Sequence, residues 1–137
     1  MVICMWDPIQ KLGAMAHMFQ SCREMIDASH SRSERMEGAS PDSAVPYLLL
    51  RMLGLGALQK NIRVRLVGAG NMFSGVADGS ALDVGKGILT CTLLAINQAG
   101  LTLNSQSVGG KFGRSVSFSV SSGLIRVGLT NGDHVLL

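Results

Sequence analysis

Glycine is spread through this sequence and limits how long any regular element can be. The 137 residues include 17 glycines, which follow neither the three-residue period of collagen nor the monotony of a flexible linker. Because glycine weakens strands and ends helices, we expect short elements joined by tight turns. Since 47% of the residues are apolar but only 4% are aromatic, the core between these elements must be largely aliphatic.

Length and charge exclude several classes of protein. The 137 residues fit one domain spanning 1–137, and a charged fraction of 15% beside 47% apolar residues excludes a disordered tail. The net charge of +3 comes with no basic cluster interleaved with aromatics, so we expect no nucleic-acid partner. No run reaches the roughly 18 apolar residues of a membrane span, and the first residues lack the basic segment of a signal peptide. We therefore expect a soluble, cytoplasmic protein without membrane insertion.

Hydrophobic patterns predict both strands and helices. The apolar runs 2–6 and 12–19 flank an Asp-Pro turn and are typical of a β-hairpin. Residues 62–67 alternate apolar and basic side chains, which predicts a half-buried strand with Arg63 and Arg65 pointing outward. The other expected elements are strands at 101–107, 115–120 and 124–129, a helix from a cap within 40–43 to Gly54 or Gly56, a helix at about 83–99, and a polar surface loop at about 20–42.

The sequence holds three cysteines, Cys4, Cys22 and Cys91, which are far apart and form no CxxC pair. This spacing predicts neither a disulfide framework nor a zinc site, and a reducing compartment fits it best. Cys4 lies within an apolar run, where burial would raise the pKa of its thiol and leave it inert. Cys22, in the polar loop, and Cys91, within a helix, are expected to be incidental.

Histidine spacing gives no sign of a metal site. His17, His30 and His134 share no i, i+4 spacing, and no acidic cluster accompanies them. Solvation explains His30 in the polar loop and His134 near the C-terminus. Gly68 and Gly70 follow a predicted strand but lack the remaining residues of a phosphate-binding loop. We therefore expect no metal and no other cofactor.

His17 is the residue whose side chain has the clearest chemical potential. It lies on a predicted strand, on the same side as Met15 and Phe19. An imidazole among apolar side chains needs a hydrogen-bond partner, and its pKa near neutrality suits a general base. From the residues alone, a core histidine with a satisfied hydrogen bond is the simpler interpretation, and a catalytic role remains open.

Five segments follow one another in a recognisable order along the chain. They are residues 2–8 (VICMWDP), 12–17 (LGAMAH), 67–72 (VGAGNM), 83–101, which opens DVG and ends AGL, and 108–114 (VGGKFGR). Together they resemble the CheD family of bacterial chemoreceptor glutamine deamidases. The resemblance covers essentially the whole chain, and its most specific parts are the GxNM and GGxFGR patterns. An unrelated aliphatic α+β domain with a buried histidine is therefore a poor alternative.

The resemblance implies a fold, a reaction and partners. The implied fold is α+β, a β-sandwich-like core of mixed sheets with about two flanking helices. The implied reaction is hydrolysis of receptor glutamine to glutamate with release of ammonia, by a cysteine nucleophile and a histidine base that matches His17. The implied partners are methyl-accepting chemoreceptors and, as a second possibility, the phosphatase CheC. The residues placed near the cleft or a partner surface are Gly68, Gly70, Asn71, Met72, Gly109, Gly110, Phe112, Gly113 and Arg114.

One departure from the family pattern concerns the nucleophile. The family cysteine belongs to a Gly-Ser-Cys stretch that aligns just before Met1, and the family threonine that assists it would be missing together with it. Cys4 is four residues from that position, about 13 Å along a strand, which is too far for it to substitute. We therefore expect a glutamine deamidase fold without amidase activity in these 137 residues. The alternative is a non-catalytic CheD-like module that binds chemoreceptors or CheC.

Overall fold

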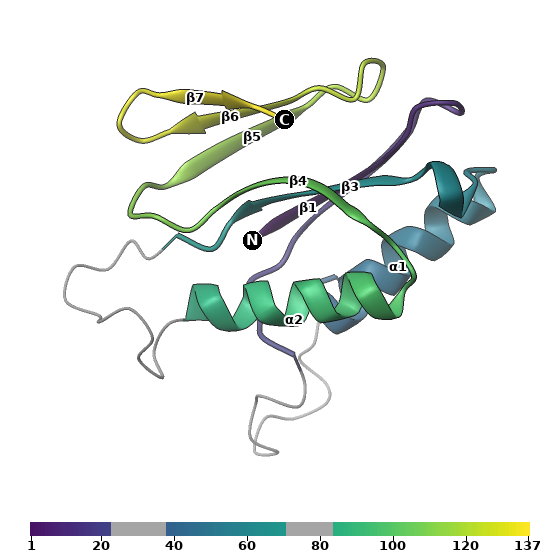
Figure 1. Ribbon diagram of the computed structural model, residues 1–137, viewed down its shortest axis with the longest axis horizontal. Coiled ribbons are helices and arrows are strands. Elements are labelled where there is room, and N and C mark those ends of the chain that lie inside the picture. The colour runs from purple at the N-terminus through teal and green to yellow at the C-terminus, as the bar shows by residue number, and fades with distance from the viewer. Residues whose placement is uncertain (23–37, 71–83) are drawn as a thin grey trace.

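The elements stack in three layers, with a small sheet on one face of a larger sheet and two helices on the other (Figure 1). The computed structural model describes residues 1–22, 38–70 and 84–137. The elements in chain order are β1 (Val2–Asp7), β2 (Leu12–His17), α1 (Pro41–Gly54), the 3-10 helix η3 (Gln59–Asn61), β3 (Arg63–Gly68), α2 (Val84–Gln98), β4 (Leu103–Val108), β5 (Arg114–Phe118), β6 (Ile125–Leu129) and β7 (His134–Leu136). This architecture confirms the expected α+β class with two flanking helices, and one of its two sheets is mixed while the other is antiparallel.

The larger sheet has the strand order β2-β1-β3-β4 and is mixed. β1 pairs antiparallel with β2 and with β3, whereas β3 pairs parallel with β4. A parallel pair needs a long crossover, and here the crossover contains α2. The smaller sheet, β5-β6-β7, is antiparallel. Its last strand, β7, is three residues long and was not expected from the sequence.

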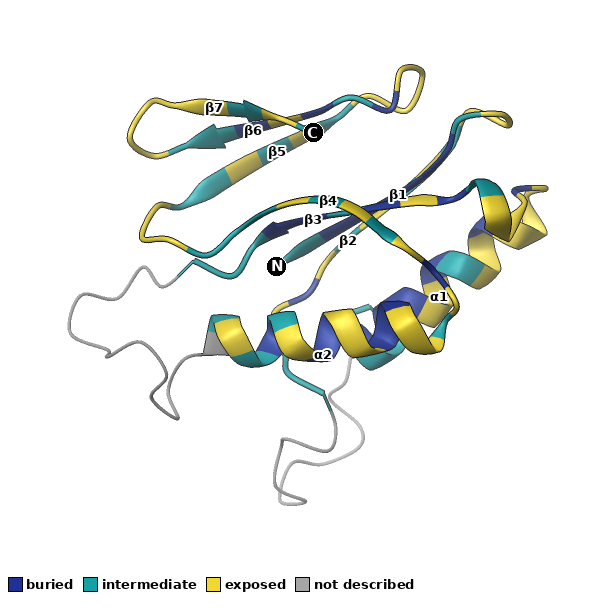
Figure 2. Ribbon diagram, in the orientation of Figure 1, coloured by how far each residue is buried: buried dark blue, intermediate teal, exposed yellow. Residues whose placement is uncertain are grey.

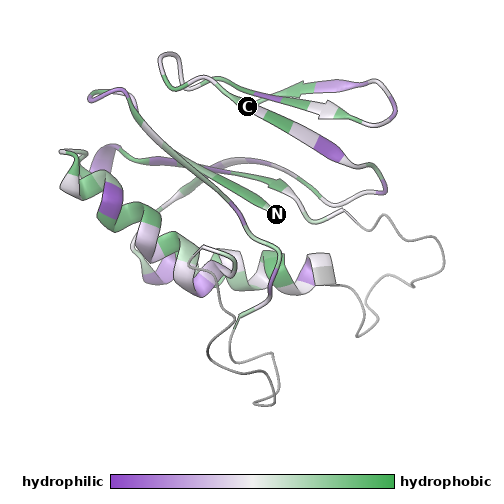
Figure 3. Cartoon of the chain, turned by 180° about the vertical axis from the view of Figure 1, so that it is seen from behind, coloured by the Kyte–Doolittle hydropathy of each residue, from purple (hydrophilic) through white to green (hydrophobic). Residues whose placement is uncertain are grey.

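Buried side chains form two clusters, one on each face of the larger sheet. The cluster on the helix side includes Ile3 and Met5 of β1 together with residues of α1 and α2. The cluster between the sheets contains Cys4, Val67, Ile125 and Val127. β1 therefore lies buried on both faces, which explains its uninterrupted apolar sequence (Figure 2). Hydrophobic residues also run along both helices (Figure 3).

Trp6, near the end of β1, packs against the loop between β5 and β6 of the smaller sheet. Its indole nitrogen donates to the carbonyl oxygen of Val120 at 2.8 Å, and the turn at Gly123 lies directly on its ring. Arg65 donates from Nη1 to the Gly123 carbonyl at 2.6 Å, with its guanidinium 5.8 Å from the indole centroid. The expectation that Arg65 points outward is therefore wrong. The smaller sheet covers that face of β3, and the Arg65 guanidinium is stabilised there by the Gly123 carbonyl and the Trp6 ring.

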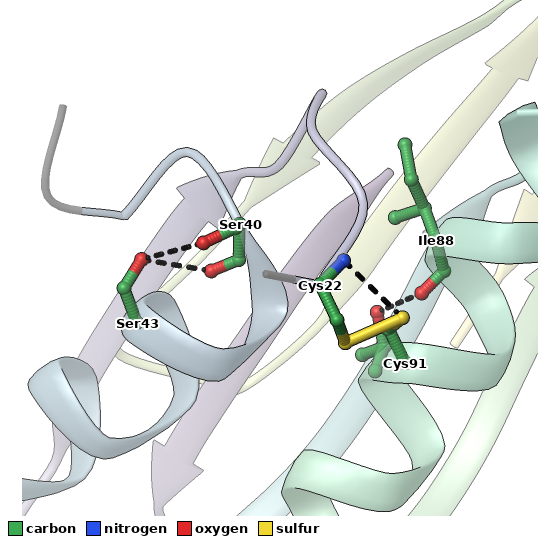
Figure 4. Close-up of a disulfide and its surroundings, with 6 residues drawn as sticks. Cys22, Ser40, Ser43, Ile88 and Cys91 are labelled. Carbon is green, nitrogen blue, oxygen red and sulfur yellow. Dashed lines mark hydrogen bonds between the residues drawn. A yellow bond between two sulfur atoms is a disulfide. The ribbon is translucent and has the colours of Figure 1, made fainter. Parts of the chain in front are cut away.

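Cys22 and Cys91 form a disulfide, so the expectation that both are incidental is wrong. Their Cα atoms lie 5.8 Å apart although 69 positions separate them in the sequence. The bond joins the segment that follows β2 to α2 (Figure 4). No pattern in the sequence signals this pairing, because only the tertiary fold brings the two cysteines together. Cys4 is the free cysteine and is buried, as expected.

The expected polar loop at 20–42 is described only at its ends. Residues 23–37 lie outside the described part of the chain, and α1 already begins at Pro41 rather than after the loop. The expected ends of both helices are confirmed, with α1 ending at Gly54 and α2 followed by Gly100 at a φ of 64°. Within the described residues, neither helix has the length and apolarity that a membrane crossing requires.

Asp7 is the last residue of β1, and its buried carboxylate accepts hydrogen bonds from three backbone amides. Its Oδ1 accepts hydrogen bonds from the amides of Ile9, at 2.8 Å, and Gln10, at 3.1 Å, while its Oδ2 accepts one from the amide of Leu58 at 3.1 Å. Burial acts to raise the pKa of Asp7. Together these amides and the Asn61 side chain outweigh burial and lower the pKa below the ordinary 3.8.

We expect Gly123→Ala to destabilise the protein more than Gly132→Ala. Both glycines have positive φ, 74° and 95°, so both substitutions strain the backbone by about 1 kcal/mol. Only the Cβ at Gly123 would overlap the Trp6 ring, whereas the one at Gly132 meets nothing within 4 Å. Gly123→Ala should therefore lower the free energy of unfolding by about 3 kcal/mol in total, measured by urea denaturation with tryptophan fluorescence. Equal losses in the two variants would contradict the packing of this turn.

We expect part of the stability of the protein to be lost in acid through Asp7. Because folding lowers the pKa of this carboxyl, its contribution is complete above the unfolded pKa near 3.8 and disappears as the pH falls through the lower folded value. Asp7→Asn should be less stable at neutral pH by about 1–3 kcal/mol, since its NH2 group faces the Leu58 amide. Urea midpoints between about pH 6 and pH 3 should fall more steeply for the wild type than for this variant. Parallel pH profiles would refute the assignment.

Candidate functional site

A cavity of about 660 Å³ opens at the end of the larger sheet where β1 begins and β2 and β3 end. The smaller sheet forms its opposite wall through β5, β6 and the start of β7. Six residues singled out from the sequence line it, namely His17, Gly68, Gly70, Phe112, Gly113 and Arg114. Gly109 and Gly110 lie in the adjoining loop, whereas Asn71 and Met72 fall outside the described residues.

His17 ends β2, directly opposite Val2 of β1. Alternate residues of β2 face the helix-side core, so His17 lies on the other face with Met15 and Phe19, which are 51% and 54% exposed. The prediction that His17 shares a face of the strand with Met15 and Phe19 is confirmed. The interpretation of His17 as a core histidine is wrong, because the residue is exposed. Its ring meets Phe19 edge to face, with centroids 6.5 Å apart. An exposed imidazole at a cavity can exchange protons with a bound molecule.

The two glycine-rich segments expected near the cleft are in direct contact. The amide of Gly109 donates to the carbonyl of Gly68 at 2.9 Å. A Cβ at Gly70 would lie 3.1 Å from Nη1 of Arg114 and 3.2 Å from the carbonyl oxygen of Phe112. Glycine at this position therefore allows the loop after β4 to lie against the end of β3. Together the two segments build one side of the cavity.

Arg114 holds that loop in shape. Its Nη2 donates to the carbonyl of Gly109 at 2.6 Å, and its Nη1 donates to that of Phe112 at 3.2 Å. The buried Nε has no hydrogen-bond partner among the described residues. The guanidinium thus places a fixed positive charge at the cavity wall, and none of the described residues that line the cavity carries a carboxylate side chain. Such a wall favours carbonyl oxygens and anions.

None of the thiols is both free and at the cavity. Burial raises the pKa of Cys4 to about 11, although the charge of Arg65 acts in the opposite direction. The Cys4 side chain packs in the cluster between the sheets. Cys22 and Cys91 are joined in the disulfide. The expectation that Cys4 is inert is confirmed, because a thiol with so high a pKa is protonated at neutral pH.

Sequence reasoning missed the contribution of the smaller sheet to this site. Thr130 lines the cavity and exchanges hydrogen bonds with Gly113, accepting from its amide at 3.2 Å and donating from its own amide to the Gly113 carbonyl at 3.1 Å. His134, expected to be merely solvated, is exposed but also borders the cavity. Only the pairing of β6 with β5 and β7 brings these residues here, so no local signal could have indicated them. No group of three metal-ligating side chains occurs in the described segments.

Comparisons with known proteins identify similar sequences along most of the chain. The family described as CheD chemotactic sensory transduction matches residues 25–128. The probable chemoreceptor glutamine deamidase CheD of Desulfitobacterium hafniense is 31% identical over 135 residues, covering 98% of this chain and 81% of that protein. The protein of the same name in Methanococcus maripaludis is 29% identical over 125 residues, covering 91% and 76%. In Clostridium novyi the values are 24% over 125 residues, covering 91% and 74%.

We expect Gly70→Ala to displace the cavity wall. The added Cβ would press on the Arg114 guanidinium and on the carbonyls of Phe112 and Gly110, the last at 3.4 Å. The substitution should shift the NMR signal of the Gly109 amide and lower the free energy of unfolding by about 1–2 kcal/mol. Gly54→Ala is the matched control, because a Cβ there meets nothing within 4 Å. An unchanged Gly109 signal in Gly70→Ala would show that the two segments do not press together.

Proposed function

This chain belongs to the CheD family, and on that premise we propose that it is a protein-glutamine deamidase of bacterial chemotaxis. The substrate is a glutamine side chain of a chemoreceptor, which becomes glutamate with release of ammonia. The observation that carries the proposal is the position of the exposed His17 in a cavity of about 660 Å³ beside the fixed cation of Arg114. The compartment we propose is the cytoplasm, and CheC is proposed as a second partner.

His17 acts as the general base in this proposal. A neutral imidazole takes the proton of a cysteine thiol, and the resulting thiolate attacks the carboxamide carbon of the substrate glutamine. The imidazolium then returns the proton to the departing nitrogen, which leaves as ammonia. Water, deprotonated by the same imidazole, hydrolyses the thioester to glutamate and regenerates the thiol. The exposure of His17 supports this role, because each step needs an imidazole that reaches a bound group.

The register of β1 supports a nucleophile at the position just before Met1. Met1 and Met18 exchange backbone hydrogen bonds of 2.8 and 2.7 Å, so the pairing of β1 with β2 reaches the first residue. Side chains alternate along a strand, so a residue before Met1 would share the face of Val2 and His17. Diagonal neighbours of this kind lie about 7–8 Å apart at their Cα atoms, close enough for a thiol to approach an imidazole. The family resemblance supports a cysteine at this position.

Arg114 and the glycine-rich segments position the substrate in this proposal. The guanidinium is held by two carbonyls and can attract the carbonyl oxygen of the carboxamide, where negative charge develops during attack. The same charge attracts the glutamate product, so Arg114 favours carboxylate formation in the cavity. Glycines 68 and 70 keep this wall free of side chains and leave space for the substrate.

A second function is favoured by an apolar hollow beside His17. All three cysteines of the chain are buried in the core or joined in the disulfide. Beside His17, a second hollow of about 280 Å³ is lined by apolar side chains that include Met15, Phe19 and Tyr47. These features fit a module that binds a chemoreceptor or CheC without hydrolysing its glutamines. Binding and ammonia release are separate measurements and distinguish the two functions.

We expect a chain extended by Gly-Ser-Cys before Met1 to release ammonia from chemoreceptor glutamines. His17→Ala in the extended chain should lower the rate by at least about 100-fold without loss of fold, because the side chain is exposed. Cys4→Ser should leave the rate unchanged, and the 137-residue chain should release no ammonia. Coupled ammonia assays and mass spectrometry of receptor peptides measure these outcomes.

The outcomes of this experiment separate the two functions. A folded extended chain that binds receptor but releases no ammonia would refute the deamidase proposal and support the binding module. Activity of the 137-residue chain that is lost in Cys4→Ser would contradict our exclusion of the buried thiol.

A further inference from the structure

One cysteine of the Cys22–Cys91 disulfide lies on the short segment that follows β2, the strand that ends at His17. Between His17 and Cys22, Met18 is fully buried, and the amides of Phe19 and Gln20 both donate to the carbonyl of Ala39, at 2.9 and 3.0 Å. Cys22 is half-buried at the end of this segment. Its position is therefore set by a few hydrogen bonds and by the covalent bond to Cys91.

The other end of the disulfide lies on α2, whose start contacts the glycine-rich segment at the end of β3. Cys91 is 2% exposed and faces Cys22 from α2 (Figure 4). At the start of the same helix, a Cβ at Gly85 would lie 3.2 Å from the carbonyl carbon and oxygen of Ala69, so helix and segment are in close contact. Ala69 and Gly70 line the cavity. α2 thus contacts the glycine-rich segment that lines the cavity, and the disulfide joins it to the segment that follows β2 and His17.

We propose that Cys22 and Cys91 form a redox site whose state sets the distance between the end of β2, which carries His17, and the glycine-rich segment at the end of β3. In the oxidised form the disulfide fixes the segment after β2 to α2, and the contact between Gly85 and Ala69 connects α2 to the glycine-rich segment. In the reduced form the covalent link to α2 is lost. Residues 19–22 are then held by the hydrogen bonds of Phe19 and Gln20 to Ala39 and by the 3.3 Å contact of the Cys22 amide with Cys91 Sγ, so they can separate from the helix more readily. The site requires no cofactor and goes beyond the deamidase function, since it concerns the geometry of the cavity and not the reaction.

The chemistry of this site is thiol–disulfide exchange with a glutathione-class disulfide. The half-buried Cys22 thiolate attacks one sulfur of the oxidant and releases one glutathione thiolate, which takes a proton. The Cys91 thiolate then attacks Cys22 in the mixed disulfide and releases the second glutathione. Two electrons and two protons pass from the cysteine pair to the oxidant. Excess reduced glutathione reverses both steps.

The first experiment measures the redox state of the 137-residue chain by alkylation. Protein is equilibrated at different ratios of reduced to oxidised glutathione, denatured in acid and alkylated, and the adducts are counted by mass spectrometry. With three cysteines in the chain, the oxidised form takes one adduct and the reduced form three. Cys22→Ser should take two adducts at reducing ratios with no intramolecular bond at any ratio, and Cys4→Ser should leave the transition unchanged. Three adducts at every ratio, or one adduct even in excess reduced glutathione, would overturn the redox site.

The second experiment tests the coupling to the cavity and needs no variant. Between the oxidised and reduced forms of the wild type, NMR signals of the Gly70 amide and the His17 imidazole should shift. The signal of the Trp6 indole N–H should not shift, because Trp6 lies at the other end of β1 and donates its hydrogen bond to Val120. Hydrogen exchange at the Phe19 and Gln20 amides should be at least about tenfold faster after reduction, with Val127 as the unaffected control.

A change of redox state that leaves Gly70, His17 and these exchange rates unaltered would overturn the coupling. None of these measurements depends on ammonia release. Failure of this proposal is therefore distinguishable from failure of the deamidase proposal.

Discussion

Burial of β1 on both of its faces is the constraint on which the other layers depend. Ile3 and Met5 pack toward the helices, while Cys4 faces the smaller sheet. One strand therefore belongs to both cores, and displacing it would expose the two together. The same strand fixes the register of β2, which places His17 opposite Val2 in the lining of the cavity. The position of the candidate catalytic histidine is thus a consequence of how the central strand is packed.

Much of the fold could be predicted because its signals are local. The unbroken apolar run of β1, the alternation in β3 and the glycine after α2 each report on a single element. The failures concern contacts between distant elements. Arg65 looks solvent-exposed by alternation, yet the turn at Gly123 covers it, and the partner of Cys22 lies 69 positions away. Alternation indicates that two faces differ, but it does not indicate whether a second sheet covers the polar one.

The candidate site shows the same division between local and distant information. The side of β2 that carries His17 followed from the two-residue period of a strand, but its exposure depends on how far the smaller sheet extends. The glycine-rich segments were found through their resemblance to a family and not from spacing alone. Their contact through Gly68 and Gly109 joins elements that the crossover through α2 brings together. Thr130 and His134 carried no signal because β6 and β7 reach the cavity only through sheet pairing.

Three different interactions hold the walls of the cavity, and they differ in what can disturb them. Backbone pairing of β1 with β2 holds His17 and depends on the packing of the core. The Arg114 guanidinium holds the loop after β4 through hydrogen bonds to two carbonyls, and this contact depends on the conformation of that loop. The bond between Cys22 and Cys91 depends on the surrounding thiols. Of the three, only the disulfide is a covalent bond that a thiol can make or break, and in our proposal it is the contact through which the surroundings of the protein alter the cavity.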